Sequence, residues 1–148
     1  MFKHVLISTD GSRLAAKGVK AGVKLAAALG ARVTGVCVTP PWRIPMYSEG
    51  AGAARMVSPA QYKDDMERAA RKALSLVEIE AEAAGVRWST LHATADRPWQ
   101  GILKSAAGRK CDAIVMASHG RGGLGGLLLG SETTRVLAGT KLPVMVIR

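Results

Sequence analysis

The sequence ASHGRGGLGGLLLGS occupies residues 117–131 and directly follows the apolar run 113–116. Five of the seven residues from Gly120 to Gly126 are glycine, and Gly130-Ser131 begins the predicted last helix. Glycine lets main-chain N–H groups turn toward a ligand because it has no Cβ. The first turn of a helix adds unpaired N–H donors and a partial positive charge. A strand, a glycine-rich loop and a helix start in this order predict an anion site, and phosphate is the obvious ligand.

Apolar runs alternate with helical patterns along the rest of the chain. Strands are predicted at 5–7, 33–38, 86–93, 112–116 and 142–147, and helices at 14–29, 59–84, 99–108 and 131–138. Such alternation is typical of a parallel sheet with helices on both faces, an α/β fold. Polar residues make 86–93 a predicted edge strand, and Pro143, which cannot donate to a strand ladder, places the last strand at an edge. Gly18 and Gly22 in the first helix predict a close approach to the sheet.

The length of 148 residues predicts one domain over 1–148, with a flexible loop at about 40–58 that is rich in proline, glycine and small residues. No apolar stretch reaches the roughly 18 residues of a membrane span, and the start does not resemble a signal peptide. Cys37 and Cys111 each lie beside apolar residues, without metal-binding spacing, and are interpreted as small buried hydrophobes. A reduced, cytoplasmic protein is therefore expected.

The formal net charge is +10. Arg13, Lys17, Lys20 and Lys24 recur at helical spacing, so they share one face of the predicted first helix. A basic stripe attracts nucleic acid or another polyanion, although it is more often the solvated outer face of a helix. Three tryptophans, two tyrosines and one phenylalanine are few aromatic residues for stacking on single-stranded bases.

Two familiar nucleotide motifs fail on the glycine segment. Gly120, Gly122 and Gly125 satisfy G-x-G-x-x-G, but the dinucleotide motif also needs a following crossover and an acidic residue about 20 positions later. No Asp or Glu follows Glu132. Residues 125–131 spell G-x-x-x-x-G-S, without the lysine that a phosphate-binding Walker loop requires.

The sequence predicts a binding module rather than a fast enzyme. Glu78, Glu80 and Glu82 alternate around a helix, so they do not form a pair of carboxylates on one face. His119 has no nucleophile or second carboxylate placed to work with it and is interpreted as a hydrogen-bonding loop residue. No metal cage or cysteine nucleophile is evident, and hydrolysis is not predicted.

Three features together carry a family resemblance that covers the whole chain. They are Ser8-Thr9-Asp10-Gly11-Ser12 after the first strand, Ala117-Ser118-His119-Gly120 with nine residues before Gly130-Ser131, and the terminal Leu-Pro-Val-Met-Val-Ile-Arg. The chain resembles the universal stress protein family. The resemblance implies a doubly wound five-stranded parallel sheet of order 3-2-1-4-5, of the adenine nucleotide alpha hydrolase-like kind. In the members that bind nucleotide it implies a site for ATP or AMP between strands 1 and 4.

The resemblance also implies site residues. Thr9 and Asp10 would lie by the adenine, and Val38 would offer main-chain groups and an apolar surface to it. Ala117 and Gly120 would bracket the ribose and the phosphates. The phosphates would be held by Arg121, Gly130, Ser131 and the N–H groups of Glu132 and Thr133. Mg²⁺ can accompany ATP through its phosphate oxygens.

The binding motif of the family usually begins with glycine, and here it begins with Ala117. If that position needs a positive φ or a close approach of the ribose, the methyl group costs on the order of 1–2 kcal/mol, roughly a tenfold loss of affinity. The carboxylate of Glu132 is expected to point away from the phosphates, because it would repel them.

The apolar last strand, Val144 to Ile147, leaves an unpaired sheet edge that must be covered. Related proteins dimerise through that strand, so a homodimer is expected. The prediction is a module that binds ATP or AMP and acts in stress response or signalling. One alternative is a basic protein that binds nucleic acid or another polyanion. Another is a family member that binds no nucleotide and works as a dimeric interaction module.

Overall fold

A computed structural model of the chain describes residues 1–44, 57–119 and 129–148. Its elements, in chain order, are β1 His4–Ser8, α1 Arg13–Leu29, β2 Arg32–Thr39, α2 Pro59–Ala83, β3 Trp88–Thr94, α3 Pro98–Gly108, β4 Ala113–Ala117, α4 Ser131–Gly139 and β5 Val144–Ile147. Every predicted strand and helix is present. Residues 40–44, 57 and 58 of the predicted loop form no helix or strand, and its remainder, 45–56, lies outside the described residues.

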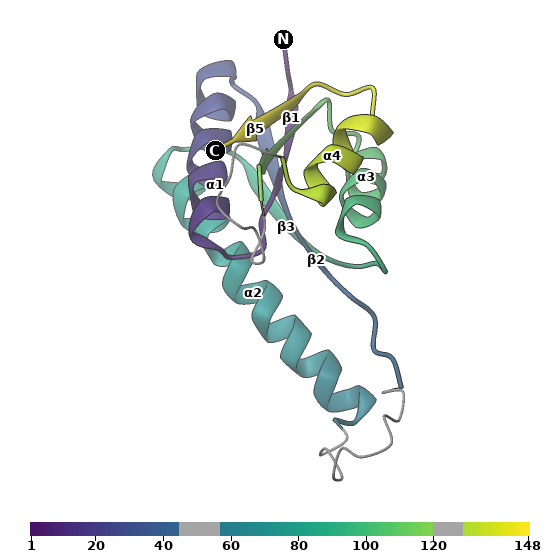
Figure 1. The fold of residues 1–148 in the computed structure, drawn as a ribbon. Coiled ribbons are helices and arrows are strands. Elements are labelled where there is room, and N and C mark those ends of the chain that lie inside the picture. Colours follow the sequence, from purple (N-terminus) through teal and green to yellow (C-terminus); the bar gives the residue numbers. More distant parts are fainter. Residues whose placement is uncertain (45–56, 120–128) are drawn as a thin grey trace.

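The five strands form one parallel sheet in the order β3-β2-β1-β4-β5, as the resemblance implied (Figure 1). The prediction that the third and fifth strands lie at edges is confirmed. The strand order reverses at β1: β2 and β3 follow on one side of β1, and β4 and β5 follow on the other. In open α/β sheets a ligand binds beyond the carboxyl ends of the strands at such a reversal.

Helices cover both faces of the sheet (Figure 1). One face packs α1 and α2 against β1, β2 and β4 through Val19, Val23 and Val77. The other face packs α3 and α4 against the same three strands through Ile102 and Val136. Because both faces of the central strands are covered, β1 and β4 are nearly continuous apolar runs rather than alternating ones.

Helix α1 packs closely on the sheet at Gly18 and Gly22, as predicted from these two glycines. A Cβ at Gly22 would lie 2.8 Å from Cδ1 of Ile7, and a Cβ at Gly18 would lie 3.5 Å from the main-chain nitrogen of Ala117. The same relation holds on the opposite face, where a Cβ at Gly101 of α3 would lie 2.6 Å from the side chain of Val38.

Two strands begin two residues later than predicted, for a local reason in each case. The N–H of Val86 donates to the carbonyl of Ala81 and so completes the end of α2, which delays β3 to Trp88. The N–H of Leu142 donates to Oγ1 of Thr140 in a tight turn, and β5 starts only after Pro143. Local hydrogen bonds of this kind compete with strand pairing.

Both cysteines are buried thiols, as predicted. Burial raises the pKa of the Cys111 thiol to about 11, so the thiol is protonated at neutral pH. The basic residues of α1, from Arg13 to Lys24, are all exposed, and Lys20 lies 3.7 Å from the carboxylate of Glu80 on α2. In the described part of the chain no helix is both long and apolar enough to cross a membrane.

His4 makes the stability of the fold depend on pH. Burial lowers the pKa of this imidazole, and Arg32 lowers it further, although main-chain hydrogen bonding by Arg109 and the charge of Asp112 oppose them. At pH values below 6.5, the ordinary pKa of histidine, His4 therefore binds a proton more readily in the unfolded chain than in the folded protein.

We expect the free energy of unfolding to decrease as the pH falls from 7.5 to 5.5. His4→Gln removes the titrating group, so its melting temperature should change less over the same interval. Thermal unfolding followed by circular dichroism at both pH values measures the difference. An equal decrease in the two proteins would contradict this role of His4.

Candidate functional site

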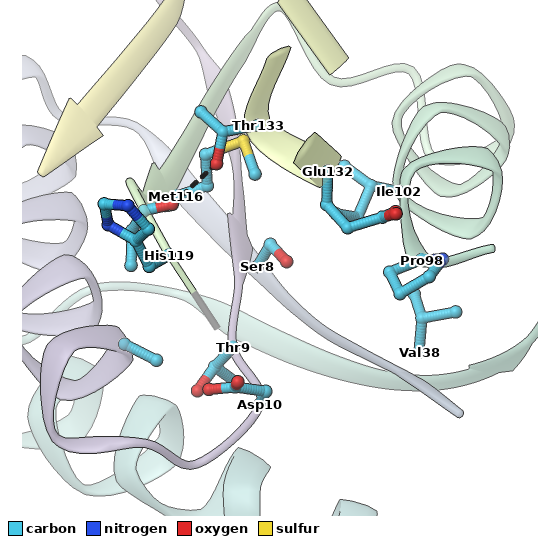
Figure 2. A pocket seen from close by; sticks show the side chains of 12 residues that line it. Ser8, Thr9, Asp10, Val38, Pro98, Ile102, Met116, His119, Glu132 and Thr133 are labelled. Carbon is cyan, nitrogen blue, oxygen red and sulfur yellow. Dashed lines mark hydrogen bonds between the residues drawn. The ribbon is translucent and has the colours of Figure 1, made fainter. Parts of the chain in front are cut away.

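A cavity of about 140 Å³ lies at the carboxyl ends of the strands, where the sheet order reverses. It is lined by Ser8, Thr9, Asp10, Ala15, Val38, Pro98, Ile102, Met116, Ala117, His119, Glu132 and Thr133. In Figure 2 the side chains of Val38, Pro98, Ile102 and Glu132 gather on one side of this cavity, and His119 lies on the other. The cavity joins three strand ends to the amino-terminal turns of α1, α3 and α4.

The segment that follows β1 supplies the polar end of the cavity. Thr9 is buried, its N–H donates to the carbonyl of Val36, and its Oγ1 accepts a hydrogen bond from the N–H of Gly11. Oδ1 of Asp10 accepts from the N–H of Ser12 at 2.9 Å. The cap of α1 is Ser12, whose Oγ accepts from the N–H of Ala15. Asp10 is therefore not the helix cap, and its carboxylate is fixed in the cavity wall.

The opposite wall is apolar and formed by two elements in close contact. Val38 comes from β2, and Ile102 and Pro98 come from the first turns of α3. Gly101 allows this contact because any side chain there would collide with Val38. A flat, apolar wall beside fixed hydrogen-bonding groups is the arrangement that small-molecule sites commonly use.

Thr133 attaches the start of α4 to the end of β4. Its hydroxyl donates to the carbonyl of Ala117 at 3.1 Å and to the carbonyl of Ser118 at 3.0 Å, and the residue is buried. Gly130 adds a third link, because its N–H donates to the carbonyl of Ser118 at 2.8 Å. A Cβ at Gly130 would lie 2.9 Å from that same carbonyl oxygen. The close approach of the two segments therefore requires glycine at position 130.

The first turn of α4 faces this junction with unpaired donors. Gly130 is the residue that caps the helix, and it provides no side-chain hydrogen bond. Within the described residues, no acceptor pairs with the main-chain N–H groups of Ser131, Glu132 and Thr133. These donors, together with the helix dipole, form an anion-binding arrangement.

Glu132 has a structural partner that the sequence did not reveal. Its Oε2 accepts a hydrogen bond from the main-chain N–H of Trp99 at 2.8 Å, in the first turn of α3. Arg97, which precedes that helix, provides no side-chain cap. The carboxylate of Glu132 therefore caps α3 from a neighbouring helix, and it turns toward α3 (Figure 2).

Six of the ten predicted site residues line the cavity, namely Thr9, Asp10, Val38, Ala117, Glu132 and Thr133. Gly130 and Ser131 lie beside it rather than in its wall. Gly120 and Arg121 lie outside the described residues. Ala117 belongs to strand β4, and its φ is not positive. A glycine at position 117 is therefore not needed for a positive φ. The only difference between alanine and glycine here is the space that the methyl group of Ala117 takes up.

The apolar lining from α3 and from Met116 was not predicted from the sequence. The pattern had placed Ile102 on the buried stripe of a helix, but only the pairing of β2 with β1 brings that helix to the site. Among the described residues, no cluster of His, Cys, Asp or Glu could hold a metal ion. The arrangement can bind a ligand that is flat and apolar at one end and anionic at the other.

Replacing Glu132 by alanine should lower the free energy of unfolding by about 1 kcal/mol, because it removes the cap of α3. Glu132→Gln, which keeps an oxygen acceptor but loses the charge, should cost less than half as much. Urea denaturation of the two variants and the parent protein measures the difference. If alanine and glutamine have the same effect, the hydrogen bond to Trp99 does not stabilise α3.

Comparison with known proteins agrees with this geometry. A family model described as "Universal stress protein family" matches residues 1–148. A universal stress protein of Thermus aquaticus is 32% identical over 149 residues, with both chains fully covered. The protein YxiE of Bacillus subtilis, another universal stress protein, is 28% identical over 152 residues, again with both chains fully covered.

Solved structures share the fold. The universal stress protein UspA of Lactobacillus plantarum superposes with a TM-score of 0.78 at 21% identity, over 99% of this chain and 97% of its own. A universal stress protein in complex with cAMP gives a TM-score of 0.69 at 25% identity, over 99% and 97% of the two chains. One from Archaeoglobus fulgidus in complex with dAMP gives 0.60 at 19% identity, over 100% and 98%. The chain has the adenine nucleotide alpha hydrolase-like fold, and it belongs to the universal stress protein family.

Proposed function

We propose that the protein binds an adenine nucleotide, ATP or AMP, at the carboxyl ends of β1 and β4 and acts in the cytoplasm as a stress-response or signalling module. The observation that carries this proposal is the cavity itself. It places a fixed carboxylate and an apolar wall at one end, and at the other end the N–H groups of α4 for which the described residues offer no acceptor. The universal stress protein that was solved with cAMP, 25% identical to this chain, supports an adenine nucleotide as the ligand.

The base, the ribose and the phosphates of such a ligand would each contact a different group of the described residues. The cavity of about 140 Å³ has room for a planar base but not for a whole nucleotide, since complete ligand sites are typically ~300–1,000 Å³. The base would lie between Asp10 and the apolar wall at Val38, with the Asp10 carboxylate accepting from an exocyclic amine. The ribose would pass Ala117. The phosphates would then lie at the first turn of α4.

The carboxylate of Glu132 does not oppose this placement. The carboxylate accepts a hydrogen bond from the N–H of Trp99. The phosphates would therefore contact the main-chain N–H of Glu132 and not its side chain. The hydrogen bonds of Gly130 and Thr133 fix the first turn of α4 at the end of β4. The phosphates would follow the ribose at this point. Mg²⁺ would accompany ATP through phosphate oxygens and water, the usual arrangement for this ion.

Calorimetric titration of nucleotide-stripped protein with ATP and with AMP tests the proposal. We expect saturable binding of at least one nucleotide, and we expect Gly130→Val to abolish it because the added side chain would separate α4 from Ser118. Circular dichroism of that variant verifies that it folds. Removal of Asp10 by Asp10→Ala should weaken binding by about tenfold without moving the phosphate site.

The matched control distinguishes nucleotide binding from polyanion binding. The double variant Lys17→Gln and Lys24→Gln removes two exposed charges of α1. We expect it to bind nucleotide within about twofold of the parent protein, because distant exposed charges are screened by salt. Binding that depends on these lysines and falls steeply with salt would favour the polyanion alternative instead.

Ala117→Gly tests the position of the ribose. Since Ala117 already has an extended backbone, the only change is removal of one methyl group from the cavity wall. Affinity for ATP should stay equal or rise by up to about tenfold. A large loss of affinity, measured by the same titration, would show that the ribose does not pass this residue.

The free edge of the sheet supports a homodimer as part of the proposal. β5 pairs with β4 on one side, and no other strand of the described residues pairs with its outer side. The strand is entirely apolar, and Met145 is 43% exposed. An exposed apolar edge is a template for pairing with a second chain.

Met145→Lys places a charge on that edge with little effect on the core, because Met145 is an exposed residue outside the buried clusters. We expect light scattering to show a dimer for the parent protein and a monomer for the variant at the same concentration. A lysine at exposed Leu137 on α4 is the matched control, and it should leave the dimer intact. A dimer that persists in Met145→Lys would contradict an interface at β5.

A further inference from the structure

A second hollow lies at the opposite, amino-terminal ends of the strands. Its volume is about 270 Å³, and it is lined by His4, Arg32, Val33, Thr34, Arg87, Trp88, Ser89 and Arg109. These residues come from the first residues of β1, β2 and β3, from the turn before β3 and from the end of α3. The sequence analysis singled out none of them as functional.

Three guanidinium groups without acidic partners surround this hollow. They belong to Arg32, Arg87 and Arg109, which are all exposed. In residues 1–44, 57–119 and 129–148, none of the three forms an ion pair. Other exposed cations do find partners, as Arg43 does with Asp96. Three like charges at one concave site repel one another, and an anion between them would relieve that repulsion.

The acidic group beside His4, that of Asp112, already accepts hydrogen bonds from the main chain. Its two carboxylate oxygens accept hydrogen bonds from the N–H groups of Lys3 and His4 at 2.8 and 3.0 Å. Burial raises the pKa of this carboxyl, but the main-chain hydrogen bonds from Lys3, His4 and Asp112 itself, together with the charge of His4, bring the pKa below its ordinary value. Asp112 therefore anchors the start of β1, and it forms no ion pair with the three arginines.

A chain of buried polar side chains lies beneath the hollow and crosses three strands. Nε2 of His4 is 2.8 Å from Oγ1 of Thr34, which is in turn 2.9 Å from Oγ of Ser89. His4 and Thr34 are almost completely buried, whereas Ser89, the last member of this hydrogen-bonded row, is half-buried. A serine hydroxyl rotates to donate or accept, so Ser89 can donate to an anion above it.

We propose that this hollow binds a compact phosphate-bearing anion, such as a diphosphate group, by means of Arg32, Arg87, Arg109 and the hydroxyl of Ser89. Guanidinium groups match phosphate oxygens with two parallel hydrogen bonds, which makes arginine the preferred residue for such recognition. The volume of the hollow is about 270 Å³. That space suits one or two phosphate groups.

The shape favours a small ligand over a nucleic acid. The three arginines converge on one concavity, whereas a duplex presents its phosphates along an extended line and needs a matching stripe of cations. The side chain of Trp88, 37% exposed in the lining, gives any organic part of the ligand an apolar contact. The site is independent of the proposed nucleotide pocket, because the two lie at opposite ends of the same strands.

Titration calorimetry with inorganic pyrophosphate, in a buffer free of phosphate, tests this site. We expect Arg32→Gln, Arg87→Gln and Arg109→Gln each to weaken binding by about tenfold, since each removes charge-assisted hydrogen bonds. Combined with Gly130→Val, which removes the proposed phosphate site at α4, the triple variant should show no binding. Arg71→Gln, which removes one exposed charge from α2, is the matched control and should bind like the parent protein.

The Gly130→Val variant separates this site from the nucleotide pocket. Pyrophosphate should bind it with unchanged affinity if the anion lies at the amino-terminal ends of the strands. The triple arginine variant should in turn bind AMP like the parent protein. Pyrophosphate binding that is lost in Gly130→Val, or retained when the triple variant is combined with Gly130→Val, would overturn the proposal. Equal weakening by Arg71→Gln would show general charge attraction and would overturn it too.

Discussion

The parallel pairing of β4 with β1 is the constraint on which the rest of the structure depends. Val5, Leu6 and Ile7 pair with Ala113, Ile114 and Val115, on the side of β1 opposite β2. This reversal sends α1 and α3 to opposite faces of the sheet and leaves their amino-terminal turns apart above the strand ends. The cavity between them follows from topology, and the links from Gly130 and Thr133 to the end of β4 then set its far side.

Much of this arrangement could be predicted from the sequence, because it rests on local patterns. Apolar runs and glycine stops identified each strand and helix, and Pro143 placed the last strand at an edge. The strand order came from the family resemblance, since no local pattern tells β4 to pair with β1 rather than with β3. Ser8 to Ser12 and Ala117 marked two sides of the cavity because they directly follow the strands predicted at 5–7 and 112–116. The side chains from α3 and the Glu132–Trp99 hydrogen bond depend on long-range packing, which spacing cannot show.

The two ends of the sheet differ in how they offer positive charge. At the carboxyl end the charge comes from main-chain N–H groups at the start of α4, beside an apolar wall. At the amino end it comes from arginine side chains over a buried chain of hydroxyl and imidazole groups. The first arrangement suits a ligand with a flat apolar part, and the second suits compact negative charge. A net charge of +10 is thus partly concentrated in a defined hollow rather than spread evenly over the surface.

A crystal structure of the protein grown with excess AMP tests the central claim most directly. We expect the adenine between Asp10 and Val38, the ribose beside Ala117 and the phosphate on the N–H groups of Ser131, Glu132 and Thr133. A structure in which the cavity holds no nucleotide, or in which the protein's own side chains fill it, would contradict the claim. The fold would then stand, without the binding function that we derive from it.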